Sequence, residues 1–194
     1  MKIGLLGSTC NPPHKEHIKI GEYAKKHLNL DRLIFVPTKA PPHKELPEVS
    51  PELRVEMARL AVNKRPGWEV SDVELSRKGK SYTRDTIKTF REKYPKAELF
   101  CIIGSDSFLS MPWKWRGGYG ILDLCQFVVA PRPGHPIRHV SEKINSKVII
   151  LGKKKSRVSS SKIRSFLKKG KSVKKYLEPK VTEFIKNKKL YYGI

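Results

Sequence analysis

The strongest constraint on the fold is a strand–helix–strand pattern within the first 37 residues. Two short apolar runs, KIGLLG at 2–7 and RLIFVP at 32–37, are predicted to be buried strands. Between them, from His17 to Leu28, apolar side chains recur at the spacing of a helix. Two strands of one sheet that are joined through a helix run parallel, with a right-handed crossover. The chain is therefore predicted to build an α/β fold from its first residues.

The rest of the chain continues this alternation. Short apolar runs bounded by turn residues predict further strands at 97–104, 125–131 and 147–152, and an alternating run predicts a strand with one exposed side at 68–75. Helical spacing and capping residues predict helices that begin at Ser50 and that span 81–94, 159–170 and 179–190. We therefore expect a doubly wound α/β fold with a mainly parallel sheet. The expected organisation is a single domain, 1–194, with a basic helical part from about residue 153.

The composition favours the cytoplasm. No apolar run approaches the ~20 residues of a transmembrane helix, and the N-terminal apolar stretch is too short for a signal-peptide core. The cysteines, Cys10, Cys101 and Cys125, are far apart and form no CxxC motif. A sparse, odd set of this kind indicates a reducing compartment without a disulfide framework.

The net charge is unusually positive. The chain has 41 Lys and Arg against 18 Asp and Glu, a formal net charge of +23. Such a field attracts nucleic acid, anionic membranes or phosphorylated small molecules. A lysine-rich composition spread over solvated faces would give the same number. Charge by itself therefore leaves the function open.

The loop at 7–17, GSTCNPPHKEH, follows the first predicted strand and leads into a helix. Ligands of doubly wound sheets bind at the carboxyl ends of the strands, and the free N–H groups of a helix N-terminus favour an anion. His14 and His17 could donate hydrogen bonds to phosphate oxygens there. Two other interpretations stay open: a proline-stiffened connection with incidental histidines, and a metal site of Cys10, His14 and His17, which has no obvious fourth ligand.

A second anion site is predicted within 153–169, KKKSRVSSSKIRSFLKK. Its serines can cap a helix whose first turn directs N–H groups outward. The apolar side chains of that helix turn inward, so that Ser160, Ser161 and Arg164 could gather around one anion. The alternative is an ordinary capped, solvated basic helix. Two cationic helix N-termini, each after a parallel strand, would fit one polyphosphate held between them.

Seven blocks of the sequence, taken together, resemble the bacterial nicotinate-nucleotide adenylyltransferases, which belong to the HxGH-type nucleotidyltransferases. These blocks are GSTCNPPHKEH, FVPTKAPPHK, SYTRDTI, IIGSDSFL, VVAPRPG, SSSKIR and YLEPKVTEFIKNKKLYY. The resemblance covers nearly the whole chain. It implies a Rossmann-like nucleotidyltransferase fold. It also implies a reaction that joins nicotinate mononucleotide to ATP, releases pyrophosphate and forms deamido-NAD.

The chain departs from the family's pattern in three places. Glu16 replaces the usual glycine before the second histidine, where a carboxylate would repel a triphosphate unless it points away or pairs with a nearby lysine. Cys10 and Asn11 replace an aromatic–acidic pair. One extra residue in the tryptophan-rich loop leaves open whether Trp113 or Trp115 takes the family's usual tryptophan position.

The resemblance implies roles for particular residues. Around ATP it places Gly7, Ser8, Thr9, His14, His17, Gly104, Asp106, Ser160, Ser161 and Arg164, of which His14, His17 and Arg164 are expected to be catalytic. Around nicotinate mononucleotide we expect Lys44, Ser81, Tyr82, Thr83, Arg132, and either Trp113 or Trp115. Mg²⁺ should enter with ATP and bridge phosphate oxygens, so no protein residue is assigned as a metal ligand.

Two alternatives remain at this stage. Another small-molecule nucleotidyltransferase, such as one acting on phosphopantetheine, would share the phosphate site but not the pyridine pocket. A nucleic-acid-binding protein, suggested by the net charge, is less favoured and would show affinity that falls steeply with salt. We expect ATP and nicotinate mononucleotide as partners, and no membrane.

Overall fold

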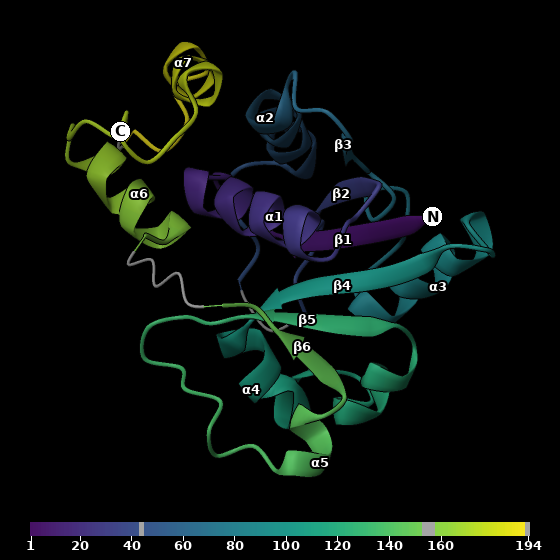
Figure 1. Ribbon diagram of the computed structural model, residues 1–194. Coiled ribbons are helices and arrows are strands. Elements are labelled where there is room, and N and C mark those ends of the chain that lie inside the picture. Colours follow the sequence, from purple (N-terminus) through teal and green to yellow (C-terminus); the bar gives the residue numbers. More distant parts are fainter. Residues whose placement is uncertain (43–44, 153–157, 193–194) are drawn as a thin grey trace.

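Six strands form one parallel sheet in the computed structural model, which describes residues 1–42, 45–152 and 158–192 (Figure 1). Their order across the sheet is β3-β2-β1-β4-β5-β6. The strands are β1 (Lys2–Ser8), β2 (Arg32–Pro37), β3 (Trp68–Val70), β4 (Glu98–Gly104), β5 (Gln126–Ala130) and β6 (Val148–Ile150). Each pairing between neighbouring strands is parallel, which confirms the predicted class of fold.

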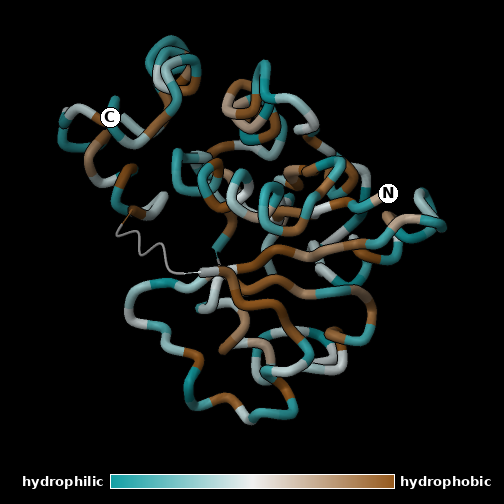
Figure 2. The backbone as a smooth tube through the Cα atoms, in the orientation of Figure 1, coloured by the Kyte–Doolittle hydropathy of each residue, from teal (hydrophilic) through white to brown (hydrophobic). Residues whose placement is uncertain are grey.

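Helices cover both faces of this sheet. On one face lie α1 (Lys15–His27), α2 (Pro51–Val62), α6 (Ser160–Lys168) and α7 (Pro179–Asn187). On the other lie α3 (Thr83–Lys93), α4 (Ser105–Lys114), the 3-10 helix η1 (Gly118–Asp123) and the short α5 (Glu142–Asn145). Each set packs its apolar side chains on the strands, and Figure 2 shows the strands as the most hydrophobic layer. The core is therefore two apolar layers separated by the sheet.

The order of the strands reverses at the centre of the sheet, between β1 and β4. β1 pairs with β2 on one side and with β4 on the other. The loops that leave β1 and β4 therefore diverge at the carboxyl ends of these strands. A crevice at such a switch point is where open α/β sheets bind their ligands.

Local signals for helix ends are also confirmed. The Ser50 side chain accepts a 3.4 Å hydrogen bond from the Leu53 N–H at the start of α2. The Ser159 side chain accepts one of 3.2 Å from the Lys162 N–H at the start of α6. Gly170, just beyond α6, has a φ of +63°, a left-handed conformation that glycine adopts without a Cβ clash.

The predicted strand at 68–75 is wrong beyond Val70. Only β3 (Trp68–Val70) pairs with the sheet. The side chain of Ser71 accepts a 3.3 Å hydrogen bond from the Val73 N–H, and this local turn replaces the strand. Short polar side chains of this kind compete with sheet pairing, and β3 is an edge strand held on one side only.

Three helical segments were not predicted: α4, η1 and α5. Pro112 lies inside α4, and Gly117 and Gly118 follow it, so the sequence between β4 and β5 has the composition of a loop. The division into one domain with a basic part from about residue 153 stays a prediction, because 153–157 lie outside the described residues. Within the described ranges, no helix combines the length and apolar character needed to cross a bilayer.

Candidate functional site

A cavity of about 790 Å³ opens at the carboxyl ends of β1 and β4. It brings together most of the residues that the sequence singled out: Gly7, Ser8, Thr9, His14, His17, Ser81, Tyr82, Thr83, Gly104, Asp106, Trp115, Arg132, Ser160, Ser161 and Arg164. Trp113 does not line it and is 81% exposed. Lys44 lies outside the described residues. The cavity is a suitable size for a nucleotide-sized ligand.

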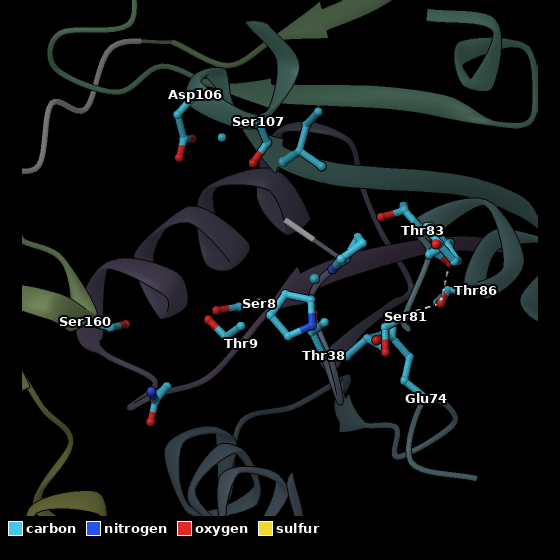
Figure 3. Close-up of a pocket in the computed structure, with 18 of the residues that line it drawn as sticks. Ser8, Thr9, Thr38, Glu74, Ser81, Thr83, Thr86, Asp106, Ser107 and Ser160 are labelled. Carbon is cyan, nitrogen blue, oxygen red and sulfur yellow. Dashed lines mark hydrogen bonds between the residues drawn. The ribbon is translucent and has the colours of Figure 1, made fainter. Parts of the chain in front are cut away.

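Figure 3 shows three groups of polar side chains around this cavity. Ser160 lies on one side, Asp106 and Ser107 on a second, and Ser81, Thr83, Thr86 and Glu74 on a third, with Ser8 and Thr9 between them. The groups come from the loops after different strands. The cavity can therefore contact different parts of one extended ligand, or two ligands, at the same time.

His14 and His17 lie at the N-terminus of α1 with their rings stacked, 3.8 Å between centroids. The backbone N–H of His14 donates to Nδ1 of His17 at 3.2 Å. Nδ1 of His17 is therefore an acceptor, which puts the proton of the neutral ring on Nε2. That Nε2 lies 3.0 Å from the Ser8 hydroxyl oxygen. The loop thus fixes the ring with an N–H at the end of β1.

Both imidazoles are held neutral. Burial, with a smaller contribution from the positive charge of Arg132, lowers the pKa of His14 to about 4. Burial, with smaller contributions from His14 and Arg132, also lowers the pKa of His17 well below its usual value. Nδ1 of His14 is buried and has no hydrogen-bond partner among the described residues. The histidines would therefore offer hydrogen bonds to a phosphate, while the positive charge comes from arginines.

The two predicted phosphate-binding segments lie side by side and are bonded to each other. Arg164 donates from Nη1 to the backbone oxygen of Asn11 at 2.8 Å, and its Nη2 lies 3.4 Å from the Ser161 hydroxyl. The Ser160 hydroxyl donates to the backbone oxygen of Pro12 at 2.9 Å. The N-terminus of α6 therefore both lines the cavity and supports the loop after β1.

The first turn of α4 adds an acidic group, and the loop after β5 adds a second arginine. Arg132 Nη1 lies 3.2 Å from Oδ2 of Asp106, while Oδ1 of Asp106 is buried and has no hydrogen-bond partner among the described residues. A Cβ atom at Gly104 would clash with both side chains. A larger residue where β4 passes into α4 would displace these two side chains, and glycine lets the pair lie close to the backbone.

The third group surrounds the N-terminus of α3. The N–H of Ser81 donates to the Ala40 oxygen at 2.8 Å, and the Ser81 hydroxyl accepts from the Ala40 N–H at 3.3 Å. Tyr82 is the N-cap residue, and Trp115 lines the cavity nearby. The first N–H groups of a helix have no partner within it. This end of the cavity therefore combines backbone donors with aromatic rings.

Glu74 and Thr86 also line the cavity and were not predicted. Glu74 is 5% exposed, and its Oε1 accepts a 2.7 Å hydrogen bond from the Thr86 hydroxyl. Arg77 Nη1 donates to the same hydroxyl at 2.9 Å. The expected strand at 68–75 gave no reason to single out Glu74, which lies in the turn that follows β3 in place of the end of that strand.

Arg54 was missed as well. It is 1% exposed, and it donates to the backbone of the loops after β1 and β2. A signal was present in the sequence. Arg54 lies three residues before Met57 and four before Ala58, on the face of α2 that packs on the sheet. An arginine on that face must find buried acceptors.

Two of the three departures from the family's pattern have a local explanation. Glu16 forms an ion pair with Lys19 at 2.9 Å, so its charge is partly neutralised by a nearby lysine. Cys10 is fully buried with a φ of +52°, and burial raises the pKa of its thiol, which disfavours the thiolate needed by a nucleophile or a metal ligand. In the described ranges, no three or more His, Cys, Asp or Glu side chains group to hold a metal ion.

This sheet, with its predicted phosphate-binding loop and the cationic helix α6 beside it, has the architecture expected of a nucleotidyltransferase. The model of the Cytidylyltransferase-like family matches residues 5–166, so the chain belongs to that family. More narrowly, it is 38% identical to "Probable nicotinate-nucleotide adenylyltransferase" of Pelobacter propionicus, with 98% of each chain covered. It is also 38% identical to the protein of that name from Shouchella clausii, with 98% of this chain and 96% of that protein covered. The chain therefore belongs to the nicotinate-nucleotide adenylyltransferase family.

Solved structures support the fold. The nicotinic acid mononucleotide adenylyltransferase of Plasmodium falciparum complexed with NaAD has a TM-score of 0.81 at 22% identity, with 98% of this chain and 97% of that chain covered. A putative nicotinate-nucleotide adenylyltransferase from Vibrio parahaemolyticus has a TM-score of 0.69 at 22% identity, with 100% of this chain and 98% of that chain covered.

Proposed function

We propose that this protein joins nicotinate mononucleotide to ATP, with release of pyrophosphate and formation of deamido-NAD. The observation that carries the proposal is that one cavity has two groups of side chains with different binding properties. Neutral histidines and Arg164 lie at one end, and the N-terminus of α3 with Trp115 lies at another. A triphosphate fits the first group, and a flat, carboxylated ring fits the second. Family membership supports the same pair of substrates.

The reaction needs no covalent intermediate with the protein. The phosphate of nicotinate mononucleotide attacks the α-phosphorus of ATP, and the bond to the pyrophosphate oxygen breaks. The protein positions both reactants and stabilises the charge on the transferring group. His14 and His17 donate hydrogen bonds to phosphate oxygens. Arg164, with Ser160 and Ser161, holds the leaving pyrophosphate.

The remaining residues frame the two nucleosides. Gly104 and Asp106 contact the ATP ribose, where the unpaired Oδ1 of Asp106 can accept a hydrogen bond from a ribose hydroxyl. Ser81, Tyr82 and Thr83 surround the pyridine ring. Arg132 remains a proposed substrate contact, and its ion pair with Asp106 supports a position close to the proposed ribose site.

Mg²⁺ is proposed to enter with ATP. The described residues contain no preformed cluster of metal ligands, and Mg²⁺ usually keeps water and phosphate oxygens as its ligands when it accompanies a nucleotide. The ion would neutralise part of the phosphate charge. We also propose the cytoplasm as the compartment, since Cys10, Cys101 and Cys125 are free thiols and ATP is a substrate.

A pyrophosphate-release assay tests the function. Purified protein receives Mg²⁺ and ATP with nicotinate mononucleotide, with phosphopantetheine, or with no second substrate. The proposal expects release only in the first arm, with deamido-NAD as the product. Release with phosphopantetheine would favour the other nucleotidyltransferase. If no arm releases pyrophosphate and the protein binds nucleic acid with an affinity that falls steeply with salt, the alternative of a nucleic-acid-binding protein would be favoured.

A further inference from the structure

Arg54 is a buried cation that bonds to backbone groups rather than to an acidic side chain in the described part of the chain. The side chain belongs to α2 and is 1% exposed, the largest fully buried side chain of the described chain. No salt bridge joins it to a carboxylate in the described ranges. Burial lowers the pKa of its guanidinium from the usual value, but arginine stays protonated near neutral pH. A buried charge of this kind is costly unless polar groups surround it.

Backbone carbonyl groups surround it. Nε donates to the Val49 oxygen at 3.0 Å, just before α2. Nη1 donates to the Thr9 oxygen at 2.8 Å and also to the Thr38 oxygen. Nη2 donates to the Lys39 oxygen at 2.8 Å. One planar group therefore joins the loop after β1 to the loop after β2.

The loop after β2 continues this connection toward the pyridine end of the cavity. The Lys39 ammonium donates to the backbone oxygens of Leu75 at 2.9 Å and Arg77 at 2.7 Å. The next residue, Ala40, makes the two hydrogen bonds with Ser81 described above. Hydrogen bonds and the Lys39–Ala40 peptide bond thus link Thr9, in the loop that carries the two histidines, to Ser81, just before α3.

We propose that Arg54 is a positioning residue that fixes the separation between the phosphate end and the pyridine end of the cavity. Arg54 itself does not line the cavity, so it acts through the two loops. Each substrate is bound mainly by its own end, whereas transfer needs both ends at the correct distance. Arg54 therefore controls the transfer step more than the affinity for either substrate. The inference rests on the proposed function.

The chemistry of the side chain explains why arginine is needed. Its planar fork offers five N–H donors in fixed directions, and four are used here. A lysine keeps the charge but has three donors on one atom, so it cannot reach all four oxygens in the same directions. A shift of about 1 Å between reacting groups can cost on the order of 10²-fold in rate.

The decisive variant is Arg54→Lys, and its matched control is Arg59→Lys on the exposed side of α2. We would measure kcat for adenylyl transfer, the dissociation constants of MgATP and of nicotinate mononucleotide separately by calorimetry, and thermal unfolding by circular dichroism. The inference expects cooperative unfolding and dissociation constants within about threefold of wild type, but a kcat lowered by about 30-fold or more. The control should keep its kcat. A merely structural role would lower the unfolding temperature and leave kcat unchanged in the folded protein.

Lys39→Met provides a second variant, since Lys39 is half-buried and does not line the cavity. Lys147→Met, which removes an exposed ion pair with Asp123, is its control. The inference expects a smaller loss of kcat in Lys39→Met, about 3- to 10-fold, with the same unchanged binding. If Arg54→Lys does not fold, this variant decides alone.

Two results would overturn the inference while the proposed function stands. One is a kcat equal to that of wild type in folded Arg54→Lys or, if that variant does not fold, in Lys39→Met. The other is a loss of kcat accompanied by an equally large increase in the dissociation constants of both substrates. Wild-type protein that transfers no adenylyl group would instead reject the proposed function, and the inference would fall with it.

Discussion

The hydroxyl of Tyr191 donates a 2.7 Å hydrogen bond to the side-chain oxygen of Asn11, 180 positions earlier in the chain. Both residues are buried. The backbone oxygen of Asn11 accepts from Arg164, and the backbone N–H of Lys15 donates to the Tyr176 oxygen at 2.9 Å. The C-terminal segment therefore holds the loop after β1 from outside the sheet, and its basic helices support the end of the cavity that is proposed to bind phosphate.

Tyr191→Phe should destabilise the protein by about 1–3 kcal/mol, because it leaves the Asn11 oxygen buried without a donor. For a chain of this size that corresponds to a fall in Tm of roughly 2–12 °C. Tyr192→Phe is the matched control, since Tyr192 is 43% exposed. Calorimetric unfolding of both variants measures the difference. Equal Tm values for Tyr191→Phe and wild type would show that the bond does not stabilise the fold.

His17→Ala should lower kcat by about 10² or more, since the loss of one donor to the transition state costs roughly 3 kcal/mol. The substitution removes the imidazole N–H at Nε2, and with it the ring that stacks on His14 and accepts the His14 backbone N–H. His27→Ala, an exposed histidine near the end of α1, is the control. Turnover is measured at saturating substrates. An unaltered kcat would remove His17 from the mechanism.

The sequence was sufficient for the parts of the fold that depend on local patterns. Apolar runs predicted the central strands, and Ser50 and Ser159 predicted the starts of α2 and α6. Arg54 needed more, because its acceptors come from loops that meet only in the folded chain. Its position on the inner face of α2 indicated burial, but only tertiary structure reveals what it contacts.

The local sequence pattern also could not decide between Trp113 and Trp115 as the tryptophan that lines the cavity. Trp113 and Trp115 are two residues apart, so their placement depends on where α4 ends. Trp115 is the C-cap residue with extended backbone angles, φ −105° and ψ 136°, and the chain leaves the helix there. Trp115 consequently turns into the cavity and Trp113 into solvent. Pro112 made this helix end hard to predict.

The stability of the ligand-free protein should fall as pH drops from about 6.5 toward 4. The pKa of His14 is about 4 in the folded state and about 6.5 when unfolded, so the unfolded chain binds more protons in this window. Stability is therefore complete above the unfolded pKa and is lost toward the folded one. At one pKa unit per 1.36 kcal/mol, His14 contributes roughly 3 kcal/mol.

Urea unfolding of wild type and His14→Gln between pH 7.5 and 4, at about half-unit steps, checks this. Glutamine does not titrate, so the difference in unfolding free energy between the two proteins should change with pH by up to about that amount. His17, whose pKa is lowered in the same direction, stays in both proteins. Parallel pH profiles would contradict a neutral, buried His14.

Trp115→Ala should weaken the binding of nicotinate mononucleotide by roughly 10-fold, because it removes an aromatic face from the proposed pyridine end of the cavity. Trp113→Ala should change its affinity by less than about twofold, since that ring is 81% exposed and away from the cavity. Calorimetric titration of both variants compares two substitutions of identical chemistry. A larger effect at Trp113 would reverse the assignment.

The protein should prefer nicotinate mononucleotide over its nicotinamide counterpart. The two rings differ by a carboxylate against an amide, and the carboxylate only accepts hydrogen bonds. The N-terminus of α3, which begins at Thr83, offers backbone N–H donors and the positive end of the helix dipole. An amide nitrogen there would face N–H against N–H or leave a donor unpaired. That penalty is roughly 2–4 kcal/mol, or about 30- to 1,000-fold in kcat/KM.

The measurement is kcat/KM for each mononucleotide under identical Mg²⁺ and ATP. Glu74 provides an internal comparison, because its buried carboxylate lines the same cavity and would itself oppose the carboxylate of the ligand. Glu74→Gln removes that charge, so it should increase the preference for nicotinate if the N–H groups of α3 set it. Trp115→Ala should affect both substrates alike, since stacking is nearly the same for both rings. A ratio near one, or a preference for the amide, would reject the donor pocket and leave adenylyl transfer intact.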